Sequence, residues 1–433
     1  MESLWKNGIH LPSFKALEGD VRTDILIVGG GMVGLLTAYM LDRAGADYLL
    51  IEKDRICSGV TQNTTAKITS QHGLVYSRLT DIFGSDYARL YWEANEDAVS
   101  EYRRISDCIS CDFENKSNFV YSVDDYDALQ RETDALKNLG IPASFVCRTK
   151  LPFPFSGAVE FRNQGQFHPL KFVSGIVSGL NIRERTKGLE FRKNTVVTDK
   201  GTITASAIII ATHFPIINKH GGYFMKMHQS RSYVVALENA PDVGGMYVSA
   251  EENGFSFRNY GNMLLLGGGS HRTGKPTDGW SPLEAFARKY YPDSAIRYRW
   301  AAQDCMTLDS SAYIGRYGRS THGLYTATGF NKWGMTQSMV AAKIFCDAVL
   351  KKTSRFAPLF NPSRKMFRPA LFGNICESAS NIFTFSVPRC PHLGCALKWN
   401  WAEHSWDCPC HGSRFSESGA LLDNPATDGI DLN

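Results

Sequence analysis

Four residues near the end of the chain have the types and the spacing of a metal centre. They form two short motifs, Cys390-Pro-His392 and Cys408-Pro-Cys-His411. Two thiolates and two imidazoles on two loops suit a [2Fe–2S] cluster in which one iron takes two sulfurs and the other takes two nitrogens. A zinc site is the alternative, although zinc ligands usually come as Cys-x₂₋₄-Cys and His-x₃₋₅-His pairs. The interleaved order of Cys and His therefore favours the cluster.

This pair of loops resembles the Rieske motif, and the resemblance extends beyond the four ligands. Cys395 and Cys410 stand where Rieske proteins of respiratory complexes place a disulfide between the two loops. Ser413 matches the position whose hydroxyl donates to a cluster sulfide. Phe415 departs from the pattern, because high-potential members carry a Tyr there that donates to a cysteine sulfur. This loss predicts a potential below the upper end of the roughly −150 to +300 mV Rieske range.

A second set of residues that could bind a reactive cofactor lies near the start of the chain. Residues 24–28 read as a buried parallel strand that leads directly into Gly29-Gly-Gly-Met-Val-Gly34. The pattern then predicts a helix that stops near Gly45 and a second strand over residues 47–52. Strand, glycines, helix and second strand in this order form the dinucleotide-binding fingerprint.

Each part of this fingerprint has a physical role toward a dinucleotide. Gly29 permits the tight turn, Gly31 lets the backbone approach a pyrophosphate, and Gly34 lets the helix and the strand pack closely. The helix N-terminus offers free N–H groups to the phosphates, and Glu52 would accept from the ribose hydroxyls. A glycine-rich turn without a ligand is the structural alternative. FAD and NAD share the same ADP half, so the fingerprint alone does not separate them.

Further segments resemble the D-amino-acid oxidase and glycine oxidase superfamily, and this resemblance implies FAD. Residues 57–72 look like the loop that reaches the flavin ring, residues 196–213 like the hairpin and returning strand, and residues 309–336 like the last flavin segment. A helix N-terminus at the end of that segment would stabilise negative charge on reduced flavin. The resemblance implies these further cofactor-binding residues: Thr64, Thr65, Gly329, Gly334, Met335 and Thr336.

From about residue 3 to residue 433, the chain resembles bacterial FAD-dependent oxidoreductases of the D-amino-acid oxidase type with a C-terminal Rieske domain. The expected fold is α/β, with a Rossmann-type FAD-binding domain, an inserted α+β substrate domain and a small all-β Rieske module. The expected bounds are residues 20–80, 150–222 and 301–360 for the FAD-binding domain, 81–149 and 223–300 for the substrate domain, 361–384 for a linker, and 385–433 for the module.

The candidate catalytic residues come from the expected substrate domain and the last flavin segment. They are Arg258, His271 and Trp333. An Arg could pair with a substrate carboxylate, and Trp333 could cover the flavin ring. The structural alternatives are a solvated charge for each Arg, including Arg231 and Arg272, and a buried aromatic for Trp333. His72 is a weaker candidate, as a base or as an attachment point for FAD.

The expected Rieske module is short. The segment between Arg364 and Cys390 shows little of the strand alternation that fuller members carry there. A module of this size buries little core without a metal or a docking surface. We therefore expect the cluster and contact with the flavin domain to hold it.

The composition limits the possible partners and location. The 433 residues are 43% hydrophobic with a net charge of +4 that is not clustered, so no nucleic acid partner is expected. Residues 1–20 lack a signal-peptide pattern, and no apolar stretch is long enough for a membrane span. Eleven cysteines without a secretion signal indicate a cytoplasmic protein, where a disulfide survives only if it is shielded.

The two expected cofactors predict a dehydrogenase. A flavin takes two electrons from a carbon next to nitrogen, and the cluster passes them singly to an external one-electron carrier. The expected substrate is an amine or an amino acid. Three alternatives stay open: a reductase with the reverse electron flow, a redox-sensing or electron-carrier flavoprotein without turnover, and a plain oxidase with a vestigial tail.

Overall fold

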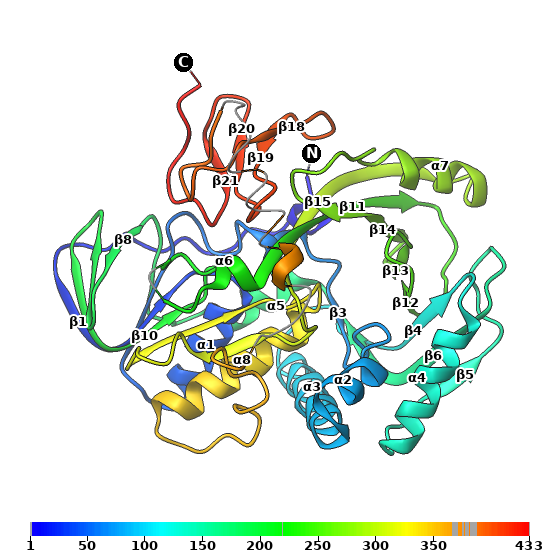
Figure 1. The fold of residues 1–433 in the computed structure, drawn as a ribbon, viewed down its shortest axis with the longest axis horizontal. Helices are drawn as coiled ribbons and strands as arrows, with labels where there is room; N and C mark the ends of the chain where they lie inside the picture. The colour runs from blue at the N-terminus through cyan, green and yellow to red at the C-terminus, as the bar shows by residue number, and fades with distance from the viewer. Residues whose placement is uncertain are drawn as a thin grey trace.

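The computed structural model describes residues 2–218, 220–365, 371–374, 376, 381 and 388–432. Within them, the strands form two large sheets and one small sheet (Figure 1). The large sheets lie on the left and the right of the view, and the small C-terminal sheet lies at the top, above β11 (Met227–Glu238) and β15 (Ala295–Thr307).

The first large sheet carries the fingerprint. It has eight strands, and its main path runs β16-β17-β10-β1-β2-β7. The pairs β1·β10, β1·β2, β10·β17 and β2·β7 are parallel. The strand bounds are β1 (Val21–Val28), β2 (Tyr48–Ile51), β7 (Ile182–Arg183), β8 (Gly188–Phe191), β9 (Thr195–Thr198), β10 (Thr202–Ile210), β16 (Tyr313–Arg316) and β17 (Leu324–Thr328).

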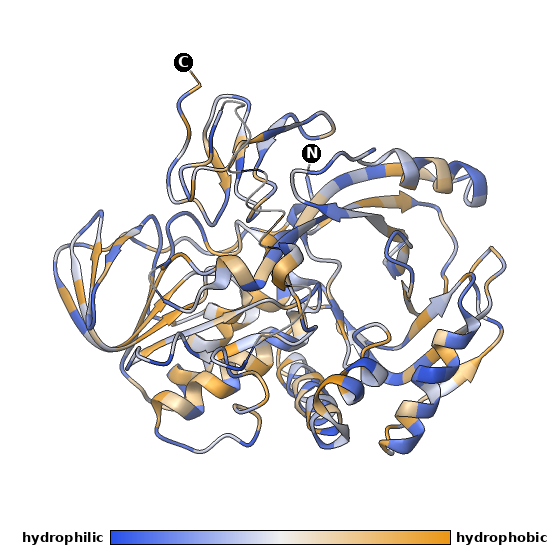
Figure 2. Ribbon diagram, in the orientation of Figure 1, coloured by the Kyte–Doolittle hydropathy of each residue, from blue (hydrophilic) through white to orange (hydrophobic). Residues whose placement is uncertain are grey.

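Two helices cover this sheet near the fingerprint. Helix α1 (Met32–Arg43) follows β1 and packs against α8 (Gly334–Val349). Both helices bury most of their residues, and Figure 2 shows α8 mainly in hydrophobic colours. The expected helix before Gly45 and the expected hairpin over residues 196–213 are confirmed, because β9 and β10 pair as antiparallel neighbours.

The second large sheet has nine strands in the order β15-β11-β14-β13-β12-β4-β6-β3, with β5 paired to β6. Its bounds, beyond β11 and β15, are β3 (Lys67–Ile68), β4 (Glu114–Ser122), β5 (Ser144–Val146), β6 (Gly157–Gln166), β12 (Met246–Ser249), β13 (Ser256–Tyr260) and β14 (Met263–Arg272). The sheet includes strands from both expected domains. Strand β6, from the expected FAD-binding domain, pairs with β4 of the expected substrate domain, and β15 pairs with β11 on both sides of the expected bound at residue 300. The bounds themselves stay a prediction.

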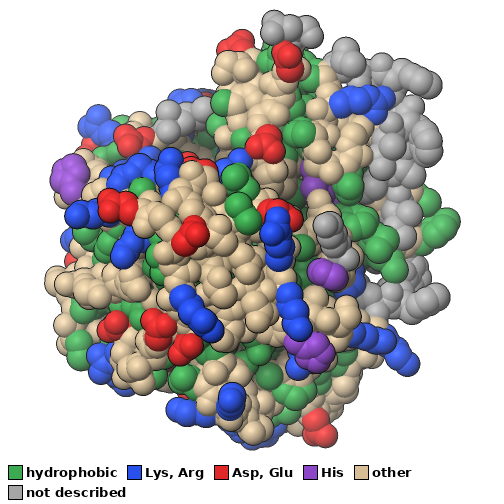
Figure 3. Space-filling model, turned by 90° about the vertical axis from the view of Figure 1, so that its left-hand side faces the viewer, with side chains coloured by type: hydrophobic (Ala, Val, Ile, Leu, Met, Phe, Trp, Pro, Cys, Tyr) green, Lys and Arg blue, Asp and Glu red, His purple; other side chains and the backbone are tan. Residues whose placement is uncertain are grey.

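The remaining helices include one that is amphipathic. Tyr91, Ala94, Ala98 and Tyr102 lie on the buried face of α3 (Ser85–Ser106), as their spacing indicates. Further helices are η1 (Leu4–Lys6), η2 (Val60–Asn63), α2 (Tyr76–Phe83), α4 (Tyr126–Asn138), α5 (Pro169–Ile176), α6 (Tyr223–Lys226) and α7 (Ser281–Tyr290). Basic and acidic side chains are interspersed on the face in Figure 3. No helix among the described residues is long and apolar enough to cross a membrane.

We call residues 388–432 the C-terminal module. Its four antiparallel strands are β18 (Lys398–Asn400), β19 (Ser405–Asp407), β20 (Arg414–Ser416) and β21 (Leu421–Asp423). Its small core contains Cys390, Leu397, Cys408 and Phe415. The disulfide between Cys395 and Cys410 is present, as expected. Neither of these two cysteines is exposed, so the bond is shielded from solvent.

The module docks on the rest of the chain through polar contacts. Arg231 of β11 forms a buried ion pair with Glu403 of the module. Arg272 donates to two backbone carbonyls of the second cluster loop, at 3.0 and 3.1 Å. From the module side, the Asn424 amide donates to the carbonyls of Thr212 and Phe214. The expected contact with the flavin domain is present at Thr212 and Phe214, whereas Arg231 and Arg272 lie within the expected bounds of the substrate domain. That the cluster also holds the module stays a prediction.

Candidate functional site

The fingerprint glycines are required by close backbone approaches. Gly29 ends β1 with a φ of +115°, and a Cβ there would lie 2.5 Å from the carbonyl oxygen of Ala211. A Cβ at Gly34 would lie 1.9 Å from the carbonyl oxygen of Gly29. Only glycine fits either place, so the sequence folds into a tight turn that leads β1 into α1.

Glu52 lies beside this turn at the end of β2. Its carboxylate accepts from the backbone N–H groups of Gly30 at 2.7 Å and Asp54 at 2.9 Å. Burial raises the pKa of Glu52. Helix α1 begins next to Glu52, and the backbone N–H of its first residue, Met32, donates to the Thr61 hydroxyl at 3.1 Å. The arrangement suits the ribose and pyrophosphate of a dinucleotide.

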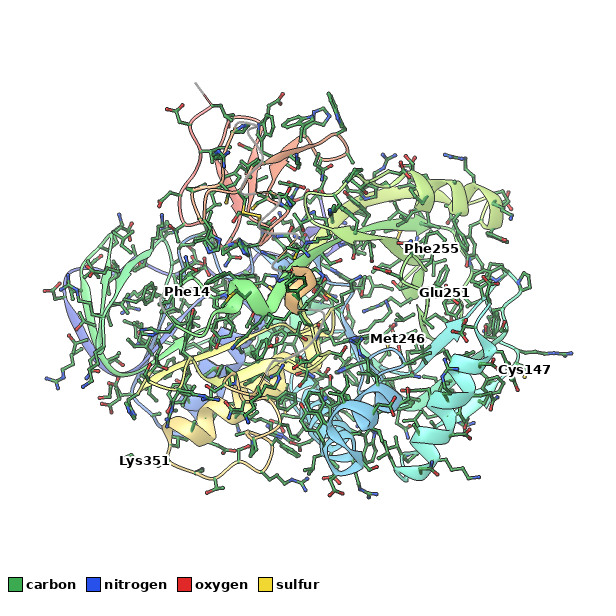
Figure 4. All side chains as sticks on the ribbon, in the orientation of Figure 1. Phe14, Cys147, Met246, Glu251, Phe255 and Lys351 are labelled. Atoms are coloured by element: carbon green, nitrogen blue, oxygen red, sulfur yellow. A yellow bond between two sulfur atoms is a disulfide. The ribbon has the colours of Figure 1, made fainter. Side chains whose placement is uncertain are left out.

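A cavity of about 710 Å³ extends from this turn to the second large sheet. This volume lies within the usual range of cofactor and ligand pockets, about 300 to 1,000 Å³. Glu251 and Phe255, on the right in Figure 4, belong to the far wall of the cavity. The expected cofactor-binding residues that line it are Gly29, Gly31, Glu52, Thr64, Thr65, Gly329, Gly334 and Met335.

The loop after η2 brings hydroxyl groups and an amine to the cavity. Thr64 accepts from the backbone N–H of Ala66 at 3.0 Å, which fixes the turn. Lys67 follows on β3 and points its amine toward the Thr65 hydroxyl, 3.4 Å away. Burial lowers the pKa of Lys67 to about 7, with the nearby charge of Arg258 as a second cause. Lys67 therefore gains or loses its charge near neutral pH.

The segment before α8 forms another part of the lining. Gly329 adopts a φ of +72°, and Gly334 and Met335 begin α8. Their backbone presents the N-terminus of a helix of 16 residues to the cavity. Thr336 and Gly34 do not line the cavity. Thr336 instead bonds to the carbonyl of Thr69 at 3.1 Å, and Gly34 packs on the turn.

His72 has both ring nitrogens occupied. The Tyr91 hydroxyl donates to Nδ1 at 2.7 Å, and Nε2 donates to the Thr69 carbonyl at 2.8 Å. The ring stacks on Trp333 with a centroid distance of 4.9 Å. Burial lowers the pKa of His72 to about 3, so the imidazole is neutral. His72 therefore supports the Trp333 indole, which lines the cavity.

The four expected cluster ligands come together in the module. Cys390 and Cys408 are buried, and their thiols hydrogen-bond to each other. The rings of His392 and His411 lie 4.9 Å apart between centroids. The Nδ1 atom of each ring is buried and has no partner among the described residues. A pair of contacting thiols and two unpartnered imidazole nitrogens, carried by the same two loops, are the donor set of a mixed sulfur and nitrogen cluster site.

The surroundings of this site support it. The Ser413 hydroxyl contacts the Cys390 thiol and accepts from the backbone N–H of Ala426 at 2.9 Å. The Cys408 sulfur lies within 4.8 Å of the sulfurs of Cys395 and Cys410. Those two sulfurs are joined in the disulfide, drawn as a yellow bond in Figure 4, so they brace the ligand loops.

Two families of known proteins match the chain. The family described as FAD dependent oxidoreductase matches residues 24–348. The chain belongs to this family. The Rieske [2Fe-2S] domain matches residues 374–432, which contain both cluster loops. The oxidoreductase therefore has FAD and a [2Fe–2S] cluster as its cofactors, and the cluster is preferred over zinc.

Individual relatives agree with both matches. The oxidoreductase is 32% identical to YhfW of Bacillus subtilis (strain 168), named as a Rieske 2Fe-2S iron-sulfur protein, over 98% of this chain and 96% of that protein. It is 23% identical to gamma-glutamylputrescine oxidoreductase of Escherichia coli (strain K12), over 80% and 88% of the chains. Its fold is similar to glycine oxidase from Geobacillus kaustophilus, with a TM-score of 0.67, 20% identity and coverage of 80% and 100%.

Arg258 does not line the cavity of the oxidoreductase. It is fully buried on β13 and donates to the carbonyls of Thr65 and Ala66, each at 2.9 Å. Burial lowers its pKa to about 9. Its position favours holding the Thr65 loop over contact with a substrate. Arg231 and Arg272 hold the module, through Glu403 and through loop carbonyls. Arg272 also lines the cavity, whereas Arg231 does not.

His271 and Trp333 both line the cavity. His271 stacks on Tyr233 with an interplanar angle of 9°, and its Nδ1 lies 3.2 Å from the Gly269 carbonyl. Its Nε2 has no partner among the described residues. The structure thus brings two of the three candidate catalytic residues to the cavity that the fingerprint borders.

The cavity also contains charged and titratable residues that the sequence did not single out. Lys332 lines it and donates to the Ser270 hydroxyl at 2.6 Å, and burial lowers its pKa. Burial raises the pKa of Asp304 and lowers those of His213 and His228. Lys332 lies within the recognised flavin segment, which was its one sequence signal. His213 closes the recognised segment 196–213, while Asp304 and His228 lie on β15 and β11, which only the fold brings to the cavity.

Proposed function

We propose that the oxidoreductase is a dehydrogenase of an amine or amino acid, and that electrons leave FAD singly through the cluster to an external one-electron carrier. One observation carries the proposal. Residues 421–424 and 426–427 of the C-terminal module line the same cavity as Gly31 and Glu52 of the fingerprint. The cluster-binding module is therefore part of the wall of the flavin site.

The proposed reaction balances in electrons and protons. The substrate loses a hydride from carbon and a proton from nitrogen, which leaves an imine. FAD, when bound, supplies the two-electron acceptor for that hydride. Two one-electron carriers of the outside solution are reduced for each substrate, and two protons are released. The cluster accounts for the change from paired to single electrons, because it accepts one at a time.

The charges of the cavity support a substrate with an amine and an acid group. Lys332 presents its side-chain amine to the cavity, where in its protonated form it would pair with a substrate carboxylate. Glu251, Glu252 and Asp304 present acid groups to the same space, where they could hold a substrate amine. The names of two similar proteins, glycine oxidase and gamma-glutamylputrescine oxidoreductase, support this class of substrate.

The residues of the chain would orient the substrate and the flavin in this reaction. The N-terminus of α8, at Gly334 and Met335, favours negative charge on the reduced flavin. Trp333, fixed by His72, would limit water and place the substrate at the flavin face. We assign no catalytic base, because hydride transfer from a neutral amine requires none.

Anaerobic reduction by candidate substrates tests the proposal. The protein loaded with both cofactors is mixed with amines and amino acids, and the flavin absorbance and the cluster EPR signal are recorded over time. We expect one class of compound to bleach the flavin and then reduce the cluster. A Cys408→Ser variant, which loses a cluster ligand, should keep flavin reduction and lose reduction of a one-electron acceptor.

Other results would select the alternatives. Fast peroxide formation in air, with a cluster that stays oxidised, would indicate a plain oxidase. Substrate reduction driven by an external reductant would indicate the reverse electron flow. A flavin that no amine or amino acid reduces would leave a redox sensor or electron carrier. A cytoplasmic location remains part of the proposal.

A further inference from the structure

Two buried glutamines join the second cluster loop to the sheet behind it. Gln229 lies on β11 and Gln303 on the neighbouring strand β15, and each side chain is only 1% exposed. The Gln229 amide donates to the carbonyls of His411 and Asn424, both at 2.8 Å. The Gln303 amide donates to the Gly412 carbonyl at 2.8 Å. Three backbone carbonyls of the module thus rest on two side chains of the sheet.

The hydrogen bonds of this amide pair are complete. Gln303 also donates to the Gln229 side-chain oxygen at 2.8 Å, and the Thr273 hydroxyl donates to the Gln303 oxygen at 3.0 Å. Every donor and acceptor of both amides therefore has a partner. A fully satisfied buried network is rigid, because each group that moves would leave another without a partner.

The strands that carry the pair also form a wall of the flavin cavity. Their neighbours His228, Ser230, Ala302 and Asp304 line the cavity, whereas the two glutamines point to the cluster loop. Successive side chains of a strand face opposite sides of a sheet. The two glutamines thus contact the loop that carries the expected ligand His411, from the same two strands whose neighbouring residues line the cavity.

The contact between loop and sheet is close at Gly412. A Cβ at Gly412 would lie 2.5 Å from Cβ of Gln229, so the loop backbone lies directly on that side chain. The two histidines of the cluster site also contact residues outside the module. His392 Nε2 lies 2.9 Å from Oδ1 of Asn218, and the His411 ring packs edge-on against Phe224.

We propose that Gln229 and Gln303 are positioning residues for electron transfer between the flavin and the cluster. They hold the His411–Gly412 backbone at a fixed place on the sheet whose other side lines the flavin cavity. This inference rests on the proposed function for the source of the electrons. The two electrons of the reduced flavin cross one at a time, and each leaves the cluster for a one-electron carrier before the next arrives. An amide neither gains nor loses a proton near neutral pH, so the pair moves no proton.

Methionine variants test the inference, since Gln229→Met and Gln303→Met keep the side-chain volume and remove the amide donors. Gln166→Met is the matched control. Gln166 is also a 1% exposed amide on this sheet and donates to the Asn259 carbonyl, away from the module. Thr273→Val is a milder variant that removes one donor from the network.

The flavin is reduced by light with a sacrificial donor under anaerobic conditions, and rapid freezing followed by EPR records the appearance of reduced cluster. We expect Gln229→Met and Gln303→Met to slow this step several-fold, because the rate of electron transfer falls steeply as the distance between the two cofactors grows. Thr273→Val should slow it less, and Gln166→Met should match the wild type. Cluster content and the EPR spectrum after dithionite reduction should be unchanged, which separates positioning from loss of the cluster.

Wild-type transfer rates in the cluster-containing Gln229→Met and Gln303→Met proteins would overturn the inference. If those two variants lose the cluster, Thr273→Val decides, and a wild-type rate there overturns it as well. The light-driven experiment needs no substrate. A failure of the proposed function would instead appear as a flavin that no amine or amino acid reduces.

Discussion

The ion pair between Arg231 and Glu403 should be the main electrostatic contact that docks the C-terminal module. Arg231 and Glu403 side chains are 9% and 7% exposed, and Arg231 Nε donates at 2.7 Å while its Nη2 makes a second bond to the same carboxylate. We predict that Arg231→Met destabilises the docked module. The paired Glu403 carboxylate loses two charge-assisted hydrogen bonds, worth about 1.5–3 kcal/mol each.

The net loss is smaller than their sum because Glu403 keeps a second partner. Arg414 of the module lies 3.0 Å from the same carboxylate. Removing one partner of a buried pair usually costs about 3–5 kcal/mol, so a value near the low end, about 3 kcal/mol, is expected here. This corresponds to a roughly 150-fold shift from the docked to the undocked state.

Urea titration measures this loss of docking free energy. The visible circular dichroism of the cluster reports the state of the module, and flavin fluorescence reports the state of the FAD-binding part. The control is Arg297→Met, which removes an ion pair with Glu238 from the same two strands. The side chains of Arg297 and Glu238 are 57% and 23% exposed, so the loss of this ion pair should lower the free energy of unfolding by at most about 1 kcal/mol. An Arg231→Met midpoint equal to the wild type, or equal losses in both variants, would refute the reasoning.

Three further predictions concern the two cofactor sites and the docking. Gly34→Ala should yield protein with little bound FAD, because its Cβ would lie 1.9 Å from the Gly29 carbonyl oxygen; the ratio of flavin to protein absorbance measures this. Phe415→Tyr should raise the reduction potential of the cluster by roughly 40 mV, because a new hydrogen bond to a cysteine sulfur would stabilise the reduced cluster by about 1 kcal/mol. An EPR-monitored redox titration measures this shift. Burial alone would raise the pKa of Glu403, but Arg231 and Arg414 lower it overall. The Glu403 carboxylate therefore contributes fully to docking above its unfolded pKa of about 4.3, and this contribution is lost as the pH falls through the lower folded pKa. Hydrogen exchange of the module should show this pH dependence in the wild type and not in Glu403→Gln.

Local patterns made the two cofactor sites predictable from the sequence. Each is built by residues close together in the chain: Gly29 to Glu52 for the dinucleotide, and two short loops for the cluster. Their chemistry requires those residue types at that spacing, because a Cβ at Gly34 cannot be accommodated and a mixed cluster needs both thiols and imidazoles.

The lining of the cavity could not be predicted in the same way. Whether an Arg on a strand faces a substrate or a carbonyl depends on what packs on that side of the sheet. Arg258 meets the Thr65 loop from a distant part of the sequence, and Arg231 meets Glu403 of the module. Conversely, Asp304 reaches the cavity from β15 and His213 reaches it from the segment after β10, and no local motif connects the two.

The contacts that complete the folding of the C-terminal module also fix its position. Its core holds few apolar side chains, of which four are cysteines, so the module depends on the surface beneath it. That surface includes Gln229, Arg231 and Arg272, which hold the second cluster loop and the turn between β18 and β19. A module that leaves this surface would lose the partners of buried polar groups. The cluster is therefore expected to stay in place during turnover, and the carrier must come to it.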